Sequence, residues 1–146
     1  MPTAARLFGA LCFAILAFVA SVAVVPYLPK DTPVGYMPLI NAGIGVLVGW
    51  MIVGANAGQG YALALTNGLR GAVTIVFFSV LLFAGREMII RSMHRLYHGP
   101  QDALQHGAGL MLEYALYLVN QTELAILILG GVLAGYIVEF VSHRWR

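Results

Sequence analysis

Charged residues are scarce in this chain of 146 amino acids. Only 10% of its residues are Asp, Glu, Lys or Arg, whereas soluble globular domains average about 25%. Apolar residues make up 60% and the mean hydropathy is +0.85, more apolar surface than a water-soluble domain of this length can bury. These residues form long blocks and lack the alternation of a lipid-facing barrel strand. The composition therefore predicts an all-α, polytopic membrane protein in contact with the lipid bilayer.

Dense basic stripes and cysteine pairs are also missing. The formal net charge is only +2, which disfavours nucleic acid as a partner. Cys12 is the single cysteine, so an intramolecular disulfide and a cysteine zinc site are excluded, and we expect a packing role for it. The sequence contains no HExxH, Walker loop, nucleophile elbow or Rossmann fingerprint. We therefore expect neither an enzyme nor a bound cofactor or metal.

Four apolar blocks are long enough to cross about 30 Å of hydrocarbon as helices that rise about 1.5 Å per residue. They cover approximately residues 5–25, 38–55, 66–90 and 123–141 of a single membrane domain, 1–146. The alternative for the first block is a signal peptide cleaved near Ser21-Val22-Ala23, which the length of the block disfavours. A third span that begins after Arg70 would place this arginine at an interface and avoid a charge at the bilayer centre.

The segment after Pro100 leaves the number of spans open. It is apolar except for one stripe of polar residues, formed by Asp102, His106, Glu113, Tyr117 and Asn120. Residues 101–120 therefore form either an amphipathic interfacial helix or a fifth span. Four spans divide the basic residues evenly between the two sides, whereas five place six of the eight on one side. We predict that the region from Arg86 to His106 is cytoplasmic.

Small residues recur at spacings that allow two helices to approach closely in lipid. The helix-packing positions are the GxxxG pairs Gly45/Gly49 and Gly131/Gly135 and a four-residue repeat of Gly60, Ala64, Gly68 and Ala72. Because a short glycine-rich turn joins them, we expect the second and third spans to form a tightly packed hairpin. Such faces also favour a homo-oligomer or a partner membrane protein.

Ionisable side chains gather in the region after Gly85. Glu87, Arg91, His94 and His98 step by four, three and four residues and would share one face of a continuous helix. The candidates are an anion site, a solvated or headgroup-facing basic surface, and a metal site. The fixed positive charge of Arg91 favours an oxyanion and opposes a divalent cation.

Two carboxylates within apolar segments are further candidates. Glu113 lies on the ambiguous segment, and Glu139 lies near the end of the last span. Ionisable groups within membranes are often functional, so a proton or ion relay is one interpretation. The alternative is a structural ion pair with a nearby arginine.

Several sequence blocks in a fixed order suggest a family. MPTAARL is followed by NAGIGVLVGW with Gly58-Gln59-Gly60, then by EMIIRS, RLYHGP, LEYALYL, LGGVLAG and RWR. Over nearly its whole length the chain resembles the TrgA family of small tellurite-resistance membrane proteins of alphaproteobacteria. The resemblance implies a multi-pass protein of the bacterial inner (cytoplasmic) membrane associated with tellurium resistance, and it supplies no site residues.

Two classes of function follow. The first is a resistance protein that alters the handling of a toxic oxyanion at the inner membrane, by transport, by exclusion or by assisting another membrane protein. The second is an accessory or structural subunit that docks onto a larger membrane protein complex through its small-residue faces.

Overall fold

The chain is helical in the computed structural model, which describes residues 3–28, 30, 34–94, 98–118 and 120–145. Its five α-helices are α1 (Thr3–Val24), α2 (Met37–Val48), α3 (Tyr61–Met93), α4 (Pro100–Leu118) and α5 (Gln121–Arg144). A 3-10 turn, η1 (Val25–Tyr27), follows α1, while α2 continues through a π-helical turn (Gly49–Val53) and a 3-10 turn (Gly54–Asn56). The all-α prediction is confirmed.

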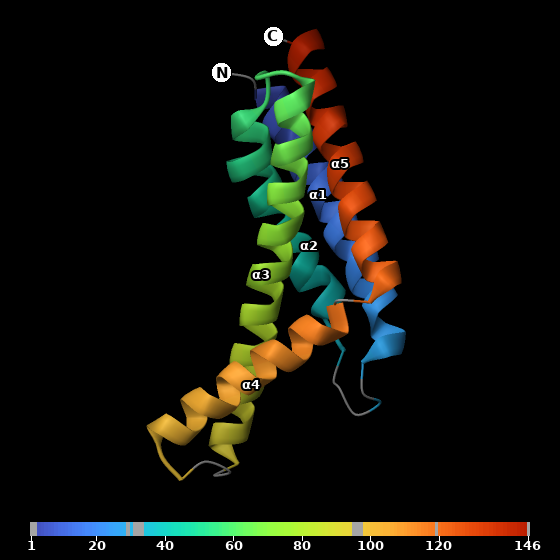
Figure 1. Cartoon of the computed structure of the whole chain (residues 1–146). Coiled ribbons are helices and arrows are strands. Elements are labelled where there is room, and N and C mark those ends of the chain that lie inside the picture. Colours follow the sequence, from blue (N-terminus) through green and yellow to red (C-terminus); the bar gives the residue numbers. More distant parts are fainter. Residues whose placement is uncertain (1–2, 29, 31–33, 95–97, 119, 146) are drawn as a thin grey trace.

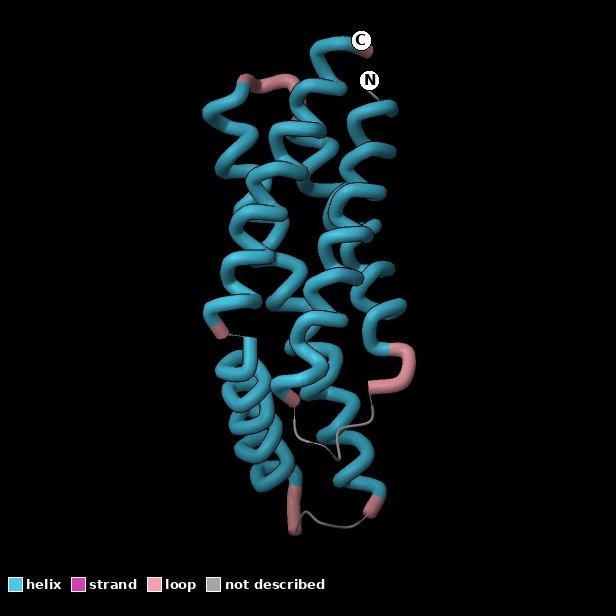
Figure 2. The backbone as a smooth tube through the Cα atoms, turned by 90° about the vertical axis from the view of Figure 1, so that its right-hand side faces the viewer, coloured by secondary structure: helices cyan, strands magenta, loops and turns pink. Residues whose placement is uncertain are grey.

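Four of the helices, α1, α2, α3 and α5, form a bundle (Figure 1). The N- and C-terminal ends and the short α2–α3 turn lie together at one end, which we call the termini end. With 33 residues α3 is about 50 Å long, so it extends beyond the opposite end of the bundle. The next helix, α4, turns back along this extension (Figures 1 and 2). We call this the hairpin end.

The four bundle helices are each long and apolar enough to cross a membrane. Large apolar side chains cover the outside of the bundle, for example Ile15 (64% exposed), Val73 (68%) and Leu129 (64%). Water would disfavour this surface, whereas lipid tails suit it. The helix α4 is not among the four spans and packs along α3, as the amphipathic alternative predicts. The structure thus shows a multi-pass arrangement with four candidate spans.

Glycines bring α1 and α2 into direct backbone contact. A Cβ atom added at Gly45 would overlap the carbonyl group of Phe13, and one at Gly49 would overlap that of Gly9. These helices therefore approach closely enough to gain dispersion contacts, which matter in lipid because the hydrophobic effect between spans is absent. The expected tight hairpin of the second and third spans is wrong, since α2 packs chiefly against α1.

The second close pair is α3 and α5. A Cβ atom at Gly68 would overlap the carbonyl of Gly131, and one at Gly135 would overlap that of Ala64. At these positions the small residues let the backbones of α3 and α5 lie against each other. Gly60 is an exception because it precedes α3 at φ 108°, a backbone conformation that favours glycine, and a Cβ there would have nothing within 4 Å. It is a turn residue and not a packing residue.

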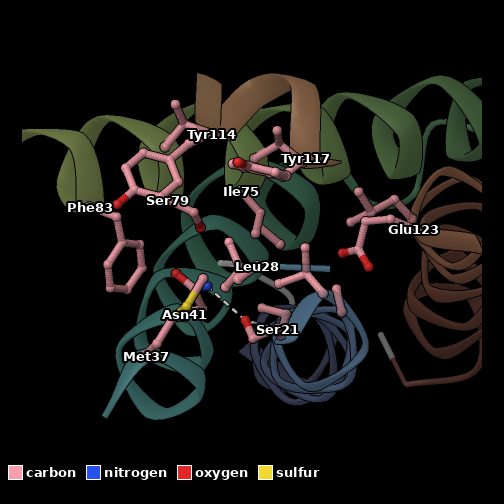
Figure 3. Close-up of a pocket in the computed structure, with 16 residues that line it drawn as sticks. Ser21, Leu28, Met37, Asn41, Ile75, Ser79, Phe83, Tyr114, Tyr117 and Glu123 are labelled. Atoms are coloured by element: carbon pink, nitrogen blue, oxygen red, sulfur yellow. Dashed lines mark hydrogen bonds between the residues drawn. The ribbon is translucent and has the colours of Figure 1, made fainter. Parts of the chain in front are cut away.

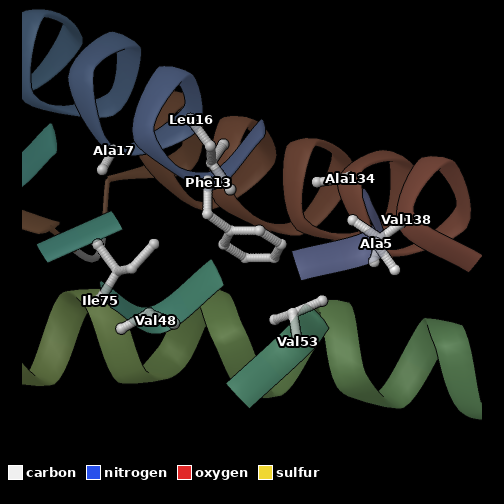
Figure 4. Close-up of a cluster of buried hydrophobic side chains, with 9 residues drawn as sticks. All are labelled: Ala5, Phe13, Leu16, Ala17, Val48, Val53, Ile75, Ala134 and Val138. Carbon is white, nitrogen blue, oxygen red and sulfur yellow. The ribbon is translucent and has the colours of Figure 1, made fainter. Parts of the chain in front are cut away.

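Phe13 occupies the middle of the core, where its ring is fully buried (Figure 4). Gly71 of α3 makes room for it, since a Cβ there would lie 2.6 Å from Phe13 Cε1 and 2.7 Å from Val53 Cγ2. Cys12, partly buried, packs against the same cluster, as expected of a small packing residue. The core therefore joins α1, the end of α2 with the turn that follows it, α3 and α5, which contributes Ala134 and Val138.

Candidate functional site

A cavity of about 40 Å³ lies inside the bundle toward the hairpin end (Figure 3). All five α-helices contribute to its lining, and its polar members are Ser21, Asn41, Ser79, Tyr114, Tyr117 and Glu123. A buried water needs about 10–15 Å³ of such space, so the cavity of about 40 Å³ has room for about three to four waters. We call it the polar cavity.

A short chain of hydrogen bonds fixes one wall of the polar cavity. Asn41 Nδ2 of α2 donates to Ser21 Oγ of α1 over 2.7 Å, and Ser21 Oγ donates to the carbonyl oxygen of Ala17 over 2.6 Å. The second bond satisfies a serine inside an apolar helix through the preceding turn. Together they hold the Asn41 side chain at the cavity, as Figure 3 shows.

Three buried polar atoms at the cavity have no hydrogen-bond partner within the described part of the chain. They are Asn41 Oδ1, Ser79 Oγ and Glu123 Oε2, and their residues are 5%, 7% and 1% exposed. Buried polar atoms nearly always have a partner, because an unmade bond costs about 1–3 kcal/mol. The cavity therefore has the chemistry of a site that takes up water or another small polar species.

Glu123 owes its position to the start of α5. Asn120 is extended (φ −79°, ψ 143°), α5 begins at Gln121, and Glu123 lies in the first turn. The partial positive charge of a helix N-terminus stabilises a carboxylate, whereas burial away from water opposes its ionisation. The helix N-terminus and the burial therefore act on the ionisation of the Glu123 carboxyl in opposite directions.

The last turns of α4 cover one side of the polar cavity with two tyrosines (Figure 3). Burial, followed by the neighbouring Glu87 carboxylate, raises the pKa of Tyr114, so its hydroxyl stays protonated and able to donate at neutral pH. Tyr117 lines the cavity as well, and its hydroxyl donates to Glu113 Oε1 on the exposed side of α4 over 3.3 Å. Tyr117 thus links the cavity to a surface carboxylate.

The residues of the candidate anion site do not all lie on one helix in the structure. Glu87 and Arg91 form an ion pair across one helical turn, with 2.9 Å between Oε1 and Nε. The α3 helix ends at Met93 with His94 as its C-cap, and His98 lies beyond it. The expectation that all four side chains share one helical face is therefore wrong. Among the described residues, no group of three or more His, Cys, Asp and Glu side chains could hold a metal ion.

Glu139 has a structural role at the termini end. Its carboxylate is 2% exposed and accepts hydrogen bonds from the backbone N–H groups of Gly58 (2.7 Å) and Gly60 (2.6 Å). His143 Nε2 lies 2.9 Å from Glu139 Oε1. The two glycines have φ of 91° and 108°, and their N–H groups donate to the two oxygens of this one carboxylate. Glu139 thus fastens the α2–α3 turn to α5.

Sequence reasoning missed most of the polar cavity. Of its residues and their neighbours, only Glu113 was a candidate, whereas Ser21, Asn41, Ser79 and Glu123 were not. The available signal was an isolated polar residue inside or at the edge of an apolar block, as in FFSVLL around Ser79. Only the packing of all five helices shows that these four residues meet.

The fold and the polar cavity define the class of protein, a multi-pass helical membrane protein with a polar site near one end of its bundle. No protein-family model matches the chain, and neither a curated protein nor a solved structure shows significant similarity to it.

Proposed function

We propose that the chain is a non-enzymatic protein of the bacterial inner membrane that supports tellurite tolerance. The observation that carries the proposal is the order and spacing of the sequence blocks that resemble the TrgA family, which extend over nearly the whole chain. The four candidate spans agree with a protein that acts within a membrane.

The chemistry of the polar cavity favours an indirect action on the oxyanion. Tellurite is an anion, whereas the cavity contains the carboxyl group of Glu123, and none of its described lining residues is Lys or Arg. Oxyanion sites rely on charge-assisted donors that this lining lacks. Elsewhere in the bundle, the backbone contacts at Gly49 and Gly68 bring the helices together closely. The protein would thus assist another membrane process instead of passing tellurite through its own bundle.

The test is growth on tellurite of a deletion strain complemented with wild type, Glu123→Gln or Gly43→Ala. Gly43 is the matched control, because a Cβ atom there has nothing within 4 Å. We expect wild type and Gly43→Ala to restore tolerance, and Glu123→Gln to restore less at equal membrane abundance. If the wild-type gene leaves tolerance unchanged, the role in tellurite tolerance is refuted.

Arg70 favours a second candidate function, that of an accessory subunit. Its side chain is exposed on the outside of the bundle, and its guanidinium has no ion-pair partner within the described residues. Gly68, two residues before Arg70, meets Gly131, the eleventh of the 24 residues of α5. Gly71, the next residue after Arg70, meets Phe13, the eleventh of the 22 residues of α1. Arg70 therefore lies within the height of the bundle and not at an end, contrary to the interfacial position that we expected.

An arginine at hydrocarbon depth costs at least about 2.5 kcal/mol unless it reaches the headgroups or finds a partner. A spanning helix of another protein that carries a carboxylate at this depth would remove that cost. Purification in mild detergent tests this. We expect a stoichiometric partner that copurifies with wild type and Arg70→Lys and is lost in Arg70→Leu. A discrete homo-oligomer without any partner would contradict the subunit role.

A further inference from the structure

We propose that the polar cavity is a proton-binding site in which the Glu123 carboxyl carries an exchangeable proton, with Tyr117 and Glu113 of α4 at its entrance. The observation behind this is the convergence of three unpaired, nine-tenths-buried polar atoms, Asn41 Oδ1, Ser79 Oγ and Glu123 Oε2, on one small cavity. The inference does not depend on a role in tellurite tolerance.

The groups around Glu123 favour a proton over an anion or a divalent metal. The titratable groups that line the cavity are Glu123, Tyr114 and Tyr117, while α1, α2 and α3 add the neutral polar groups of Ser21, Asn41 and Ser79. Near Glu123, the hydroxyl of Tyr27 in η1 lies 3.5 Å from Thr122 Oγ1. A single carboxylate among neutral oxygens provides one negative charge, which one proton neutralises, whereas divalent cations bind several charged ligands.

The unpaired atoms supply the hydrogen bonds that a proton site requires. When Glu123 is protonated, its O–H group is a donor for water in the cavity, and the free lone pairs of Asn41 Oδ1 are acceptors for the same water. When the proton leaves, it passes to that water, and the carboxylate retains one negative charge. Ser79 Oγ can then donate toward it through water. Only O–H bonds are broken and formed.

The entrance follows from the two-sided position of Tyr117. Tyr117 lines the cavity, and its hydroxyl donates to Glu113 Oε1 over 3.3 Å at the exposed face of α4. A phenol accepts one proton while it donates another, so it can pass protons between cavity water and a surface carboxylate. Tyr36 is 77% exposed and does not line the cavity, so Tyr36→Phe is the control for loss of a phenol hydroxyl.

The first experiment is modification of the purified protein by dicyclohexylcarbodiimide, an apolar reagent that reacts with protonated carboxyls, followed by mass spectrometry. We expect adducts at Glu123 that decrease as the pH rises, that excess sodium does not prevent, and that are lost in Glu123→Gln. Protection by sodium would show a bound monovalent cation and overturn the proton assignment. A carboxyl that stays unmodified at every pH in folded protein would overturn the site itself.

The second experiment tests the entrance through the infrared carbonyl band of the protonated carboxyl, assigned by its loss in Glu123→Gln. On transfer to deuterated buffer this band should shift to lower frequency as the proton exchanges. We expect slower exchange in Tyr117→Phe and Glu113→Gln than in wild type and Tyr36→Phe. Equal rates in all four proteins would refute the entrance, and a band that never shifts would refute an exchangeable proton.

Discussion

Removal of the Glu139 carboxylate should destabilise the bundle more than the loss of any exposed charge. In wild type this side chain accepts hydrogen bonds from two backbone N–H groups over 2.7 and 2.6 Å, and His143 Nε2 lies 2.9 Å away. A hydrogen bond to a charged group contributes about 1.5–3 kcal/mol, so Glu139→Ala loses about 3–6 kcal/mol from the two backbone bonds. Water reaches freed amides at a bundle end, which favours the lower figure.

The variant Glu139→Gln separates charge from shape. Glutamine retains one oxygen that can accept from Gly58 or Gly60, but its NH₂ group then faces the other backbone donor. We therefore expect a loss of about 1.5–3 kcal/mol, close to one charged hydrogen bond. The predicted order of stability is wild type, Glu139→Gln, Glu139→Ala.

The assay is unfolding by SDS in mixed micelles, followed by tryptophan fluorescence. Trp145 reports on the termini end, since its ring lies 5.7 Å from that of Phe8. Glu113→Ala is the matched control, because this exposed carboxylate accepts one long hydrogen bond of 3.3 Å, and its midpoint should stay at the wild-type value. If both Glu139 variants unfold at the wild-type SDS fraction, the fastening role of Glu139 is wrong.

Two further predictions concern packing and topology. Gly45→Ala should destabilise the bundle by about 1–3 kcal/mol, because its methyl group would overlap the Phe13 carbonyl, whereas Gly43→Ala meets open space and should not destabilise it; equal SDS midpoints would count against close α1–α2 packing. In a Cys12→Ser background, cysteines at Ser92 and at Gln59 should react with an impermeant thiol reagent from opposite sides of the membrane. Ser92 is expected on the cytoplasmic side, and labelling of both from one side would contradict four spans.

The sequence by itself determined the helical class and the approximate spans. Blocks such as Leu7 to Val25 contain no charge over a length that matches the hydrocarbon, and each helix satisfies its own backbone hydrogen bonds. These properties are local, so they can be read along the chain. The GxxxG pairs were equally visible, because small residues at four-residue spacing always share one helical face.

Only the tertiary structure decided which faces meet. Gly45 and Gly49 could have packed against any neighbouring span, and the short turn suggested α3, yet the structure pairs them with α1. In lipid, many helix pairings offer similar dispersion energy, so the choice depends on the fit of the whole bundle. The spacing of Glu87, Arg91, His94 and His98 likewise predicted one continuous helix, whereas α3 ends at Met93, before His98.

The polar cavity shows the same limit most clearly. Ser21, Asn41, Ser79 and Glu123 lie on four different helices, separated by 20 or more residues of sequence. None of them belongs to a motif that marks it in the sequence. Their shared chemistry arises because packing brings them to one cavity and leaves three of their atoms unpaired, a property of the assembled helices and of no single one.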